Sequence, residues 1–287
     1  MIKLKIKEIL IEGNKLLKDS HIDEEAIISK ILLKYLLNKD NSYLVIHQDD
    51  EVEQSIKDKF FEFVHEIILG KPVQYIVKNQ EFMGLDFYVD ENVLIPQPDT
   101  EVLVLKVLEI CKNLKCSRKL KILDLCTGSG AIAIALSKIL QEEKVQSEIF
   151  ASDISKKALE VAKKNNERNN TNVQFILSDL FQNIDEVFDI IVSNPPYIKT
   201  KVINTLSKQV QNEPKLALDG GEDGLNIYRK IINEAFAYLN GYLCLEIGFN
   251  QKNEVTNLIK ENKNYENIEQ IKDFSGNDRC IICNKVR

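Results

Sequence analysis

Hydrophobic residues near the start of the chain recur at intervals of three and four positions, which is the spacing of one face of an α-helix. This pattern covers residues 1–18, 23–37 and 51–69. Gly70 and Pro72 then interrupt it, because glycine accepts the left-handed conformation of a helix C-cap and proline cannot continue a helix. We therefore predict a small helical domain over residues 1–70.

The pattern changes after residue 70 to short runs that are typical of strands. Runs at 81–89 and 92–95 predict a β-hairpin, which Pro96-Gln97-Pro98 closes. Asp99 or Thr100 is then in position to cap a helix that begins there. We predict that residues 71–98 form a β-hairpin linker between the helical domain and a second domain over residues 99–287.

Strand-like and helix-like segments alternate beyond residue 119. Such alternation predicts β-α-β units and a mostly parallel sheet in an α/β fold. The last two strand-like runs have no helix between them and therefore predict an antiparallel hairpin at the edge of the sheet. The predicted strands are 121–126, 148–153, 173–177, 188–192, 242–246, 266–273 and 279–286, and the predicted helices are 130–141, 155–167, 225–239 and 251–260.

Composition and charge narrow the function classes. The chain has 287 residues, of which 44% are hydrophobic and 29% charged, which excludes a disordered or fibrous protein. Its net charge is -6, and all of the net acidity lies in residues 1–97. Domains that bind mainly nucleic-acid phosphates are usually basic, so we expect no direct nucleic-acid partner. Lysines interrupt the apolar residues of the N-terminus, and no apolar run approaches the roughly 20 residues of a membrane span, so we expect a cytoplasmic protein.

Six cysteines are unevenly spaced along the chain, at positions 111, 116, 126, 244, 280 and 283. In a reducing compartment, cysteines of this kind are buried thiols. Cys280 and Cys283 have the spacing of a zinc-ligand pair, but residues three apart on a strand point to opposite faces. We therefore predict no metal site.

A glycine turn separates the first strand of the predicted sheet from the helix that follows. Asp124-Leu-Cys-Thr-Gly-Ser-Gly130 lets the backbone approach a ligand at the carboxyl edge of the sheet. A dinucleotide fingerprint has a third glycine where this chain has Ala133, which weakens an NAD site without excluding it. The candidate cofactor-binding residues of this turn are Cys126, Thr127, Gly128, Ser129 and Gly130.

Two further strands end in residues suited to an adenosine group. Asp153, at the end of the second strand, can accept hydrogen bonds from both hydroxyls of a ribose. Asp179, after the third, offers an acceptor for an adenine amino group, and Leu180 with Phe181 offers an apolar surface for the ring. Three such signals at three successive strand ends predict a nucleoside-containing cofactor.

The fourth strand ends in Ser193-Asn194-Pro195-Pro196-Tyr197, the most specific signal in the chain. The two prolines fix φ and remove two donors, so nearby carbonyls are free to accept hydrogen bonds. A planar NH2 group can donate to the Asn194 side chain and to the Pro195 carbonyl while Tyr197 packs against its face. We therefore assign Asn194, Pro195 and Tyr197 to catalysis, and all four residues 194–197 to substrate binding.

In this order, these residues resemble a class I S-adenosylmethionine-dependent methyltransferase that acts on a planar nitrogen. Asn-Pro-Pro-Tyr itself is shared by adenine-N6 DNA methyltransferases, guanine-N2 rRNA methyltransferases and protein glutamine-N5 methyltransferases. Further segments over nearly the whole chain are similar to the release factor glutamine methyltransferase family, PrmC/HemK. They are Gly70-Lys-Pro-Val-Gln-Tyr-Ile76, Phe82-Met-Gly84, Val93–Glu101, Glu213-Pro214, Ala217-Leu218, Gly220-Gly221, Asp223-Gly-Leu225 and Tyr228-Arg229.

The resemblance implies a Rossmann-like sheet of seven strands, S-adenosylmethionine as cofactor, and a glutamine in the Gly-Gly-Gln motif of peptide chain release factors as substrate. The helical domain would recognise the release factor, and Asn194 would contact the cofactor as well as the glutamine. Two departures stand out: the family usually has arginine where this chain has Gln97, and Cys126 occupies the first glycine position of the general methyltransferase loop. A nucleic-acid base methyltransferase and a non-catalytic S-adenosylmethionine-binding module stay open as alternatives.

Overall fold

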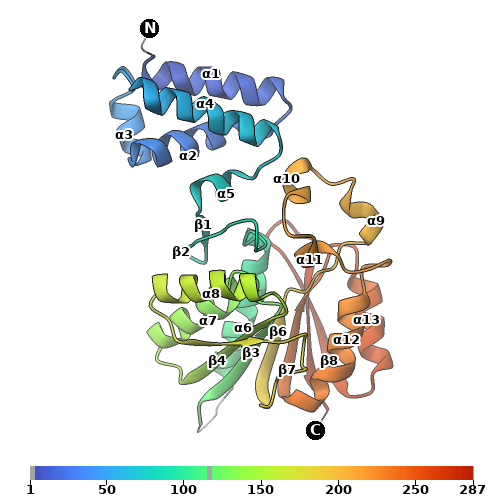
Figure 1. Ribbon diagram of the computed structural model, residues 1–287. Coiled ribbons are helices and arrows are strands. Elements are labelled where there is room, and N and C mark those ends of the chain that lie inside the picture. The colour runs from blue at the N-terminus through green and yellow to red at the C-terminus, as the bar shows by residue number, and fades with distance from the viewer. Residues whose placement is uncertain (1–3, 115–117, 287) are drawn as a thin grey trace. The chain divides into compact units, whose positions relative to one another are not determined.

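The computed structural model describes residues 4–114 and 118–286 (Figure 1). Contacts between Cα atoms divide the chain into two compact units. One unit runs to Lys78 and includes Leu206–Asn212, and the other comprises Asn79–Thr205 and the chain from Glu213 onward. Cys116 and the first three positions of the first predicted helix lie outside the described residues. The domain boundaries predicted at residues 70 and 98 stay predictions.

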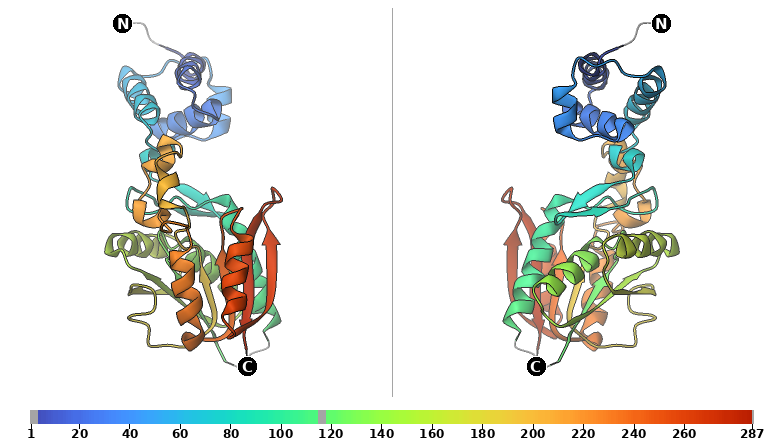
Figure 2. Two further views of the ribbon diagram at one scale, coloured as in Figure 1. Left: turned by 90° about the vertical axis from the view of Figure 1, so that its right-hand side faces the viewer. Right: turned by 90° about the vertical axis from the view of Figure 1, so that its left-hand side faces the viewer.

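The first four helices of the first unit, drawn in blue in Figure 2, form a bundle around an apolar core. The three predicted helices form, and Gly13 lets two of them pack closely, because a Cβ there would lie 2.7 Å from the ring of Phe60. Two short helices near them were not predicted from the sequence, and neither was the helix in the later segment of this unit. The helices are α1 (Ile6–Asp19), α2 (Glu25–Leu37), α3 (Asn41–Ile46), α4 (Gln54–Ile68), α5 (Val73–Val77) and α10 (Lys208–Gln211).

A short β-hairpin opens the second unit, but its strands differ from the predicted ones. β1 (Gln80–Phe82) and β2 (Leu85–Phe87) pair antiparallel across a turn at Met83-Gly84, where both residues have positive φ. This is the backbone of a tight hairpin turn. The strand predicted over 92–95 was wrong: the Ile95 N–H donates to Oε2 of Glu213 at 2.9 Å, so a carboxylate takes the place of a neighbouring strand.

The predicted seven-stranded sheet of an α/β fold is confirmed. Its strand order is β5-β4-β3-β6-β7-β9-β8, in which the first five strands run parallel and β9 is antiparallel to both of its neighbours, β7 and β8. The predicted C-terminal hairpin forms, with β8 at the edge and β9 next to β7, as the red strands of Figure 2 show. The strands are β3 (Leu120–Leu125), β4 (Ser147–Asp153), β5 (Val173–Leu177), β6 (Phe188–Ser193), β7 (Leu239–Glu246), β8 (Tyr265–Lys272) and β9 (Asp278–Lys285).

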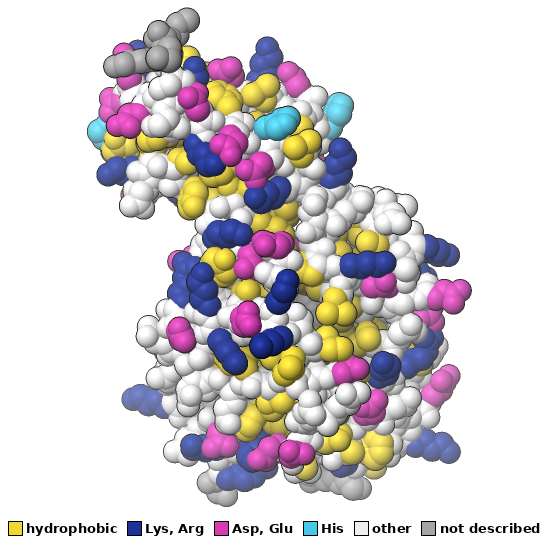
Figure 3. Space-filling model, in the orientation of Figure 1, with side chains coloured by type: hydrophobic (Ala, Val, Ile, Leu, Met, Phe, Trp, Pro, Cys, Tyr) yellow, Lys and Arg dark blue, Asp and Glu magenta, His cyan; other side chains and the backbone are white. Residues whose placement is uncertain are grey.

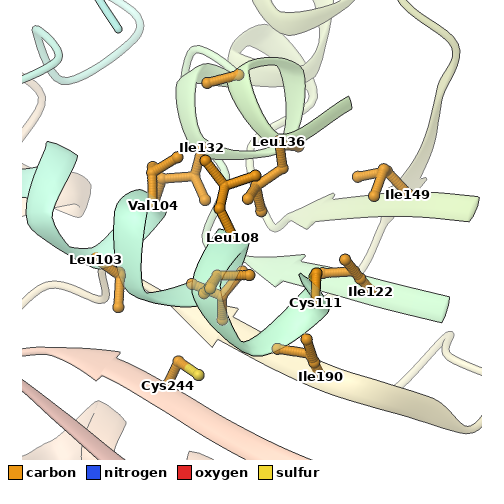
Figure 4. Close-up of a cluster of buried hydrophobic side chains, with 14 of the residues drawn as sticks. Leu103, Val104, Leu108, Cys111, Ile122, Ile132, Leu136, Ile149, Ile190 and Cys244 are labelled. Atoms are coloured by element: carbon orange, nitrogen blue, oxygen red, sulfur yellow. The ribbon is translucent and has the colours of Figure 1, made fainter. Parts of the chain in front are cut away.

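Helices cover both faces of the sheet (Figure 1). On one face, Leu103 and Leu108 pack against the neighbouring helix and the apolar residues of four parallel strands (Figure 4). The two cysteines of β9 point to opposite faces, because Cys280 belongs to this cluster and Cys283 to the cluster on the other face. The remaining elements are η1 (Pro98–Thr100), α6 (Glu101–Asn113), α7 (Ala131–Glu142), α8 (Lys156–Arg168), α9 (Thr200–Ile203), α11 (Lys215–Leu218), α12 (Asn226–Glu234), η2 (Ala235–Tyr238) and α13 (Lys252–Glu261).

Helices α6 and α7 lie on the first of these faces, and α12 and α13 lie on the second. Within the described ranges, no helix has both the length and the apolar character needed to cross a membrane.

Candidate active site

A cavity of about 300 Å³ lies in the second unit, at the carboxyl ends of the parallel strands. Small-molecule sites in proteins start at about this volume. Its wall contains seven of the residues predicted from the sequence to bind the cofactor or the substrate: Cys126, Gly128, Asp153, Asp179, Leu180, Asn194 and Pro196. The structure therefore brings together residues from the ends of four strands.

A smaller cavity of about 50 Å³ lies beside it and shares Cys126, Gly128 and Asn194 with it. Its wall adds the predicted residues Thr127 and Ser129. Neither wall includes Gly130, Pro195 or Tyr197 among the described residues. Two of the three residues assigned to catalysis therefore lie next to the cavities rather than in their walls.

The glycine turn after β3 is held open by its backbone conformation. Cys126, Gly128 and Gly130 have φ of 60°, 54° and 82°, in the left-handed region that favours glycine. A Cβ on Gly130 would lie 2.8 Å from Cδ1 of Ile134, whereas a Cβ on Gly128 would meet nothing within 4 Å. Gly130 thus allows close packing of the turn on α7, and Gly128 leaves space for a ligand.

Asp153 ties this turn to the next strand. Its Oδ2 accepts a hydrogen bond from the Gly128 N–H at 2.9 Å, and its Oδ1 accepts one from the Ser155 N–H at 2.8 Å. Burial raises the pKa of the Asp153 carboxyl, and these two backbone donors oppose that effect. The side chain both supports the turn and forms part of the cavity wall.

Asp124 is a buried support that the predicted site residues did not include. Its Oδ2 accepts hydrogen bonds from the Thr127 hydroxyl at 2.6 Å and from the Ala133 N–H at 3.2 Å. Its Oδ1 has no hydrogen-bond partner in the part of the chain that the structure describes. Burial raises the pKa of this carboxyl to about 7. The signal was present in the sequence, as a carboxylate inside the apolar run Ile-Leu-Asp-Leu.

Asn194 and the prolines follow β6 directly. Asn194 contributes to both cavities, and its Nδ2 donates to Oγ1 of Thr100 at 3.3 Å. We expected Asp99 or Thr100 to cap α6, but the Thr100 side chain makes no cap hydrogen bond, because its hydroxyl is turned toward the site. Pro195 is buried, and Pro196 reaches the larger cavity.

Tyr197 lines neither of the two cavities, and its contacts are with other parts of the catalytic unit. Burial raises the pKa of its phenol, and the Arg279 guanidinium donates a hydrogen bond to it. Its backbone carbonyl accepts a hydrogen bond from Nε2 of Gln251 at 3.0 Å. Gly220 packs directly against it, since a Cβ on Gly220 would lie 2.7 Å from the Tyr197 Cα. In this conformation Tyr197 anchors the loop.

Two segments of the cavity wall were missed by the strand-end argument. One is Glu91–Leu94, and the other consists of Pro214, Leu216, Ala217, Asp219 and Ile227. Glu213 links the two segments by accepting the Ile95 N–H, and burial raises the pKa of its carboxyl to about 7. Leu216 could have been recognised as a cavity residue only from the structure, because it is apolar and yet 57% exposed on the four-residue helix α11.

Gln97, where we expected the resembled family to have arginine, lines the smaller cavity. Its Nε2 donates to the Ile95 carbonyl at 3.0 Å, so the side chain is engaged with its own loop.

Comparison with known proteins agrees with this architecture. Residues 106–275 match the family model described as Methyltransferase small domain, and residues 8–77 match the PrmC N-terminal domain. A release factor glutamine methyltransferase from Clostridium acetobutylicum is 39% identical over 97% of this chain and 98% of its own length. The chain belongs to the release factor glutamine methyltransferase family.

A second member of this family, from Haemophilus influenzae, is 36% identical over 93% of this chain and 94% of its own length. The solved structure of a methyltransferase from Pyrococcus furiosus shares the fold, with a TM-score of 0.51 at 22% identity, covering 77% of this chain and 96% of that one. The residues that match the PrmC N-terminal domain lie in the first unit, and those that match the Methyltransferase small domain include strands β3 to β8 of the sheet.

Proposed function

We propose that this protein transfers a methyl group from S-adenosylmethionine to the side-chain amide nitrogen, N5, of the glutamine in the Gly-Gly-Gln motif of peptide chain release factors. The observation that carries this proposal is the position of Asn194 in the wall of a nucleoside-sized cavity, with the two prolines next to it. Family membership supports the substrate, since the relatives bear the name release factor glutamine methyltransferase.

The cavity suits the proposed cofactor. Open space in front of Gly128 leaves room for a ligand close to the backbone, and the Asp153 carboxylate can accept hydrogen bonds from ribose hydroxyls. Asp179 and Leu180 together offer an acceptor and an apolar surface to the adenine. S-adenosylmethionine supplies an electrophilic methyl group on its sulfonium. Thr127 and Ser129, with Cys126, complete the wall of the adjoining small cavity.

The residues around Asn194 act by orienting the glutamine. An amide nitrogen is a poor nucleophile because its lone pair is delocalised into the carbonyl group. Oδ1 of Asn194 and the backbone carbonyl of Pro195 accept the two hydrogens of the NH2 group, so that the lone pair faces the methyl group. The nitrogen–carbon bond forms as the carbon–sulfur bond breaks, and one proton leaves to water. Holding the reactants in this geometry can supply several kcal/mol of the barrier reduction.

The test is transfer of labelled methyl from S-adenosylmethionine to purified release factor. A release factor with alanine at the Gly-Gly-Gln glutamine, DNA, and ribosomal RNA serve as parallel substrates. We expect label on the unmodified release factor alone. Label on DNA or RNA instead would overturn the substrate and leave the chemistry standing, whereas no label on any substrate would favour a binding module.

The role of Asn194 is tested in the same assay with Asn194→Ala. Losing an oriented acceptor at the reacting group should lower kcat by about tenfold or more, measured at saturating S-adenosylmethionine so that any change in its Kd does not contribute. Normal turnover at unchanged cofactor affinity would rule out the orienting role of Asn194.

We also propose that the helical unit recognises the folded release factor. Charged side chains of both signs are interspersed on the face shown in Figure 3, and Val45 and Ile46 of α3 are 70% and 74% exposed. Ile46→Asp should raise KM for the release factor several-fold and leave KM for a short Gly-Gly-Gln peptide unchanged. An equal effect on both substrates would contradict this role.

A further inference from the structure

A buried carboxyl group that the mechanism above does not use lies behind the Asn194 side chain. β6 and β7 run parallel, and Ser193 pairs with Leu245. The residues that follow, Asn194 and Glu246, therefore leave the carboxyl edge of the sheet side by side. Glu246 is only 2% exposed, and its Oε2 has no hydrogen-bond partner within the described residues.

Neutral donors surround this carboxylate. Burial raises the pKa of Glu246 to about 7, and side-chain hydrogen bonds from Thr100 and Asn194 oppose that effect. Thr100 itself accepts from Nδ2 of Asn194 at 3.3 Å, which leaves the proton of its hydroxyl free to point at the carboxylate. Buried Thr100 and Glu246 and half-buried Asn194 thus form one hydrogen-bonded group from η1, the end of β7 and the loop after β6.

The nearest cation is already engaged elsewhere. Arg279 lies 2.9 Å from a carboxylate oxygen of Asp99 and 3.0 Å from one of Asp273, and it also donates to Tyr197. It attracts Glu246 at longer range, while Asp99 repels it. No ion pair among the described residues joins Glu246 to a base, so the hydrogen bond from Thr100, the longer-range attraction of Arg279 and the hydrogen bond from Asn194 together favour its ionised form.

We propose that Glu246 is a positioning residue which, with Thr100, fixes the orientation of the Asn194 amide so that Oδ1 faces the glutamine. This inference rests on the proposed function. An ionised carboxylate only accepts hydrogen bonds, so the NH2 end of the amide must face it. Rotating the amide by 180° would place Oδ1 against the carboxylate, two acceptors together. It would also present the Asn194 NH2 to the glutamine NH2, two donors together, and methyl transfer would stop.

The same arrangement gives physical meaning to the segment Asp99-Thr-Glu101. Asp99 engages Arg279, Thr100 joins Asn194 to Glu246, and Oε1 of Glu101 accepts the Met83 N–H at 2.8 Å. The three side chains thus contact three different segments, at Arg279, Asn194 and Met83. Through Thr100, this segment helps to hold the Asn194 side chain in place.

The test compares Glu246→Gln, Thr100→Val and Thr100→Ser. Glutamine can donate as well as accept, and valine keeps the shape of threonine without its hydroxyl. Losing a hydrogen bond to a charged group lowers kcat for the release factor by about 10- to 100-fold in the first two variants. The Kd for S-adenosylmethionine should stay within about twofold, and Thr100→Ser, which retains the hydroxyl, should keep most of the wild-type kcat.

Thr256→Val is the matched control, because Thr256 is another buried threonine whose hydroxyl takes part in a side-chain hydrogen bond, from Gln270 on β8. It should leave kcat unchanged. If Glu246→Gln and Thr100→Val also keep wild-type kcat, the positioning role is wrong. A loss of thermal stability without a kcat effect in the folded fraction would likewise overturn it.

A second measurement separates this inference from the proposed function. The side-chain amide of Asn194 is observed by NMR with 15N-labelled asparagine and assigned from its absence in Asn194→Ala. We expect slow exchange of its Nδ2 protons in the wild type and in Thr256→Val, and faster exchange in Glu246→Gln and Thr100→Val. Unchanged exchange would refute the contact with Glu246. Wild-type protein that methylates no release factor would refute the proposed function, while the NMR result would still decide the orientation.

Discussion

Replacing either glycine of the turn after β3 by alanine should produce two distinct defects. Both Gly128 and Gly130 have left-handed φ, so alanine is strained at either position. Only Gly130 is also crowded: its new Cβ would lie 2.8 Å from Cδ1 of Ile134 and 3.1 Å from Cβ of Ala162. The two variants therefore separate backbone strain from steric overlap.

The expected magnitudes follow from these contacts. An L-residue in the left-handed conformation costs about 1–2 kcal/mol. The reduced freedom of the unfolded chain returns about 0.4–1 kcal/mol on replacing glycine by alanine. Gly128→Ala should thus lower the free energy of unfolding by about 1 kcal/mol. Gly130→Ala adds the cost of overpacking, about 1–3 kcal/mol, because a methyl group is forced between α7 and α8.

The loss of cofactor affinity should follow the opposite order, with the larger loss in Gly128→Ala and the smaller in Gly130→Ala. Gly128 lines both cavities, and the open space before it is where the ligand would approach the backbone. A methyl group there occupies part of a cavity of about 300 Å³. We expect Gly128→Ala to weaken S-adenosylmethionine binding by about tenfold or more, since overlap with a bound ligand costs at least as much as a comparable overlap in a core. Gly130→Ala should weaken it less.

Urea unfolding followed by circular dichroism measures the stability of each variant, because the chain contains no tryptophan for fluorescence. The two units can unfold separately, so wild type and variants are compared at the same transition. Isothermal titration calorimetry gives the Kd for the cofactor. The reasoning fails if Gly130→Ala is as stable as Gly128→Ala, or if Gly128→Ala binds the cofactor as tightly as the wild type.

Two further substitutions test other parts of the catalytic unit. Burial raises the folded-state pKa of Glu213 to about 7, so ionising this carboxyl as pH rises from about 4.5 through 7 lowers the stability of the folded state. Glu213→Gln keeps an acceptor for the Ile95 N–H but does not ionise. Between pH 5 and pH 8, the free energy of unfolding of this variant should therefore fall less than that of the wild type, by up to about 3 kcal/mol. An identical fall in both proteins would contradict the buried ionisation. Leu103 is fully buried on α6 (Figure 4), so Leu103→Ala should lower the free energy of unfolding by about 2–5 kcal/mol. An unchanged free energy of unfolding in urea would mean that the neighbouring side chains fill the cavity that this substitution leaves.

The strand ends of the catalytic unit were predictable because each is a local event. A buried apolar run followed by a polar residue identifies Asp153, Asp179 and Asn194 without knowledge of the sheet order. Parallel strands then bring their carboxyl ends to one edge, so the residues meet in a single cavity. The sequence therefore indicated seven residues of the cavity wall, which lie at the ends of four strands.

Residues whose partners lie far along the chain were not predictable in this way. Thr100 meets Asn194 across 94 positions, and Glu213 meets Ile95 across 118. Their chemistry depends on the strand register and on how loops cross the sheet edge, which no local pattern encodes. The strands of the hairpin were predicted wrongly for another reason. Its turn places Met83 at positive φ, a conformation for which methionine has no preference.

The position of β9 has a consequence for the order in which the sheet assembles. This strand follows β8 along the chain, yet it lies between β7 and β8 and pairs with residues Tyr242–Glu246 of β7. It also carries Arg279, which contacts Asp99 at the site. β8 pairs only with β9 among the described strands, so β8 joins the sheet only once β9 has paired with β7. Insertion of β9 therefore completes the sheet and brings Arg279 to Asp99 in one step.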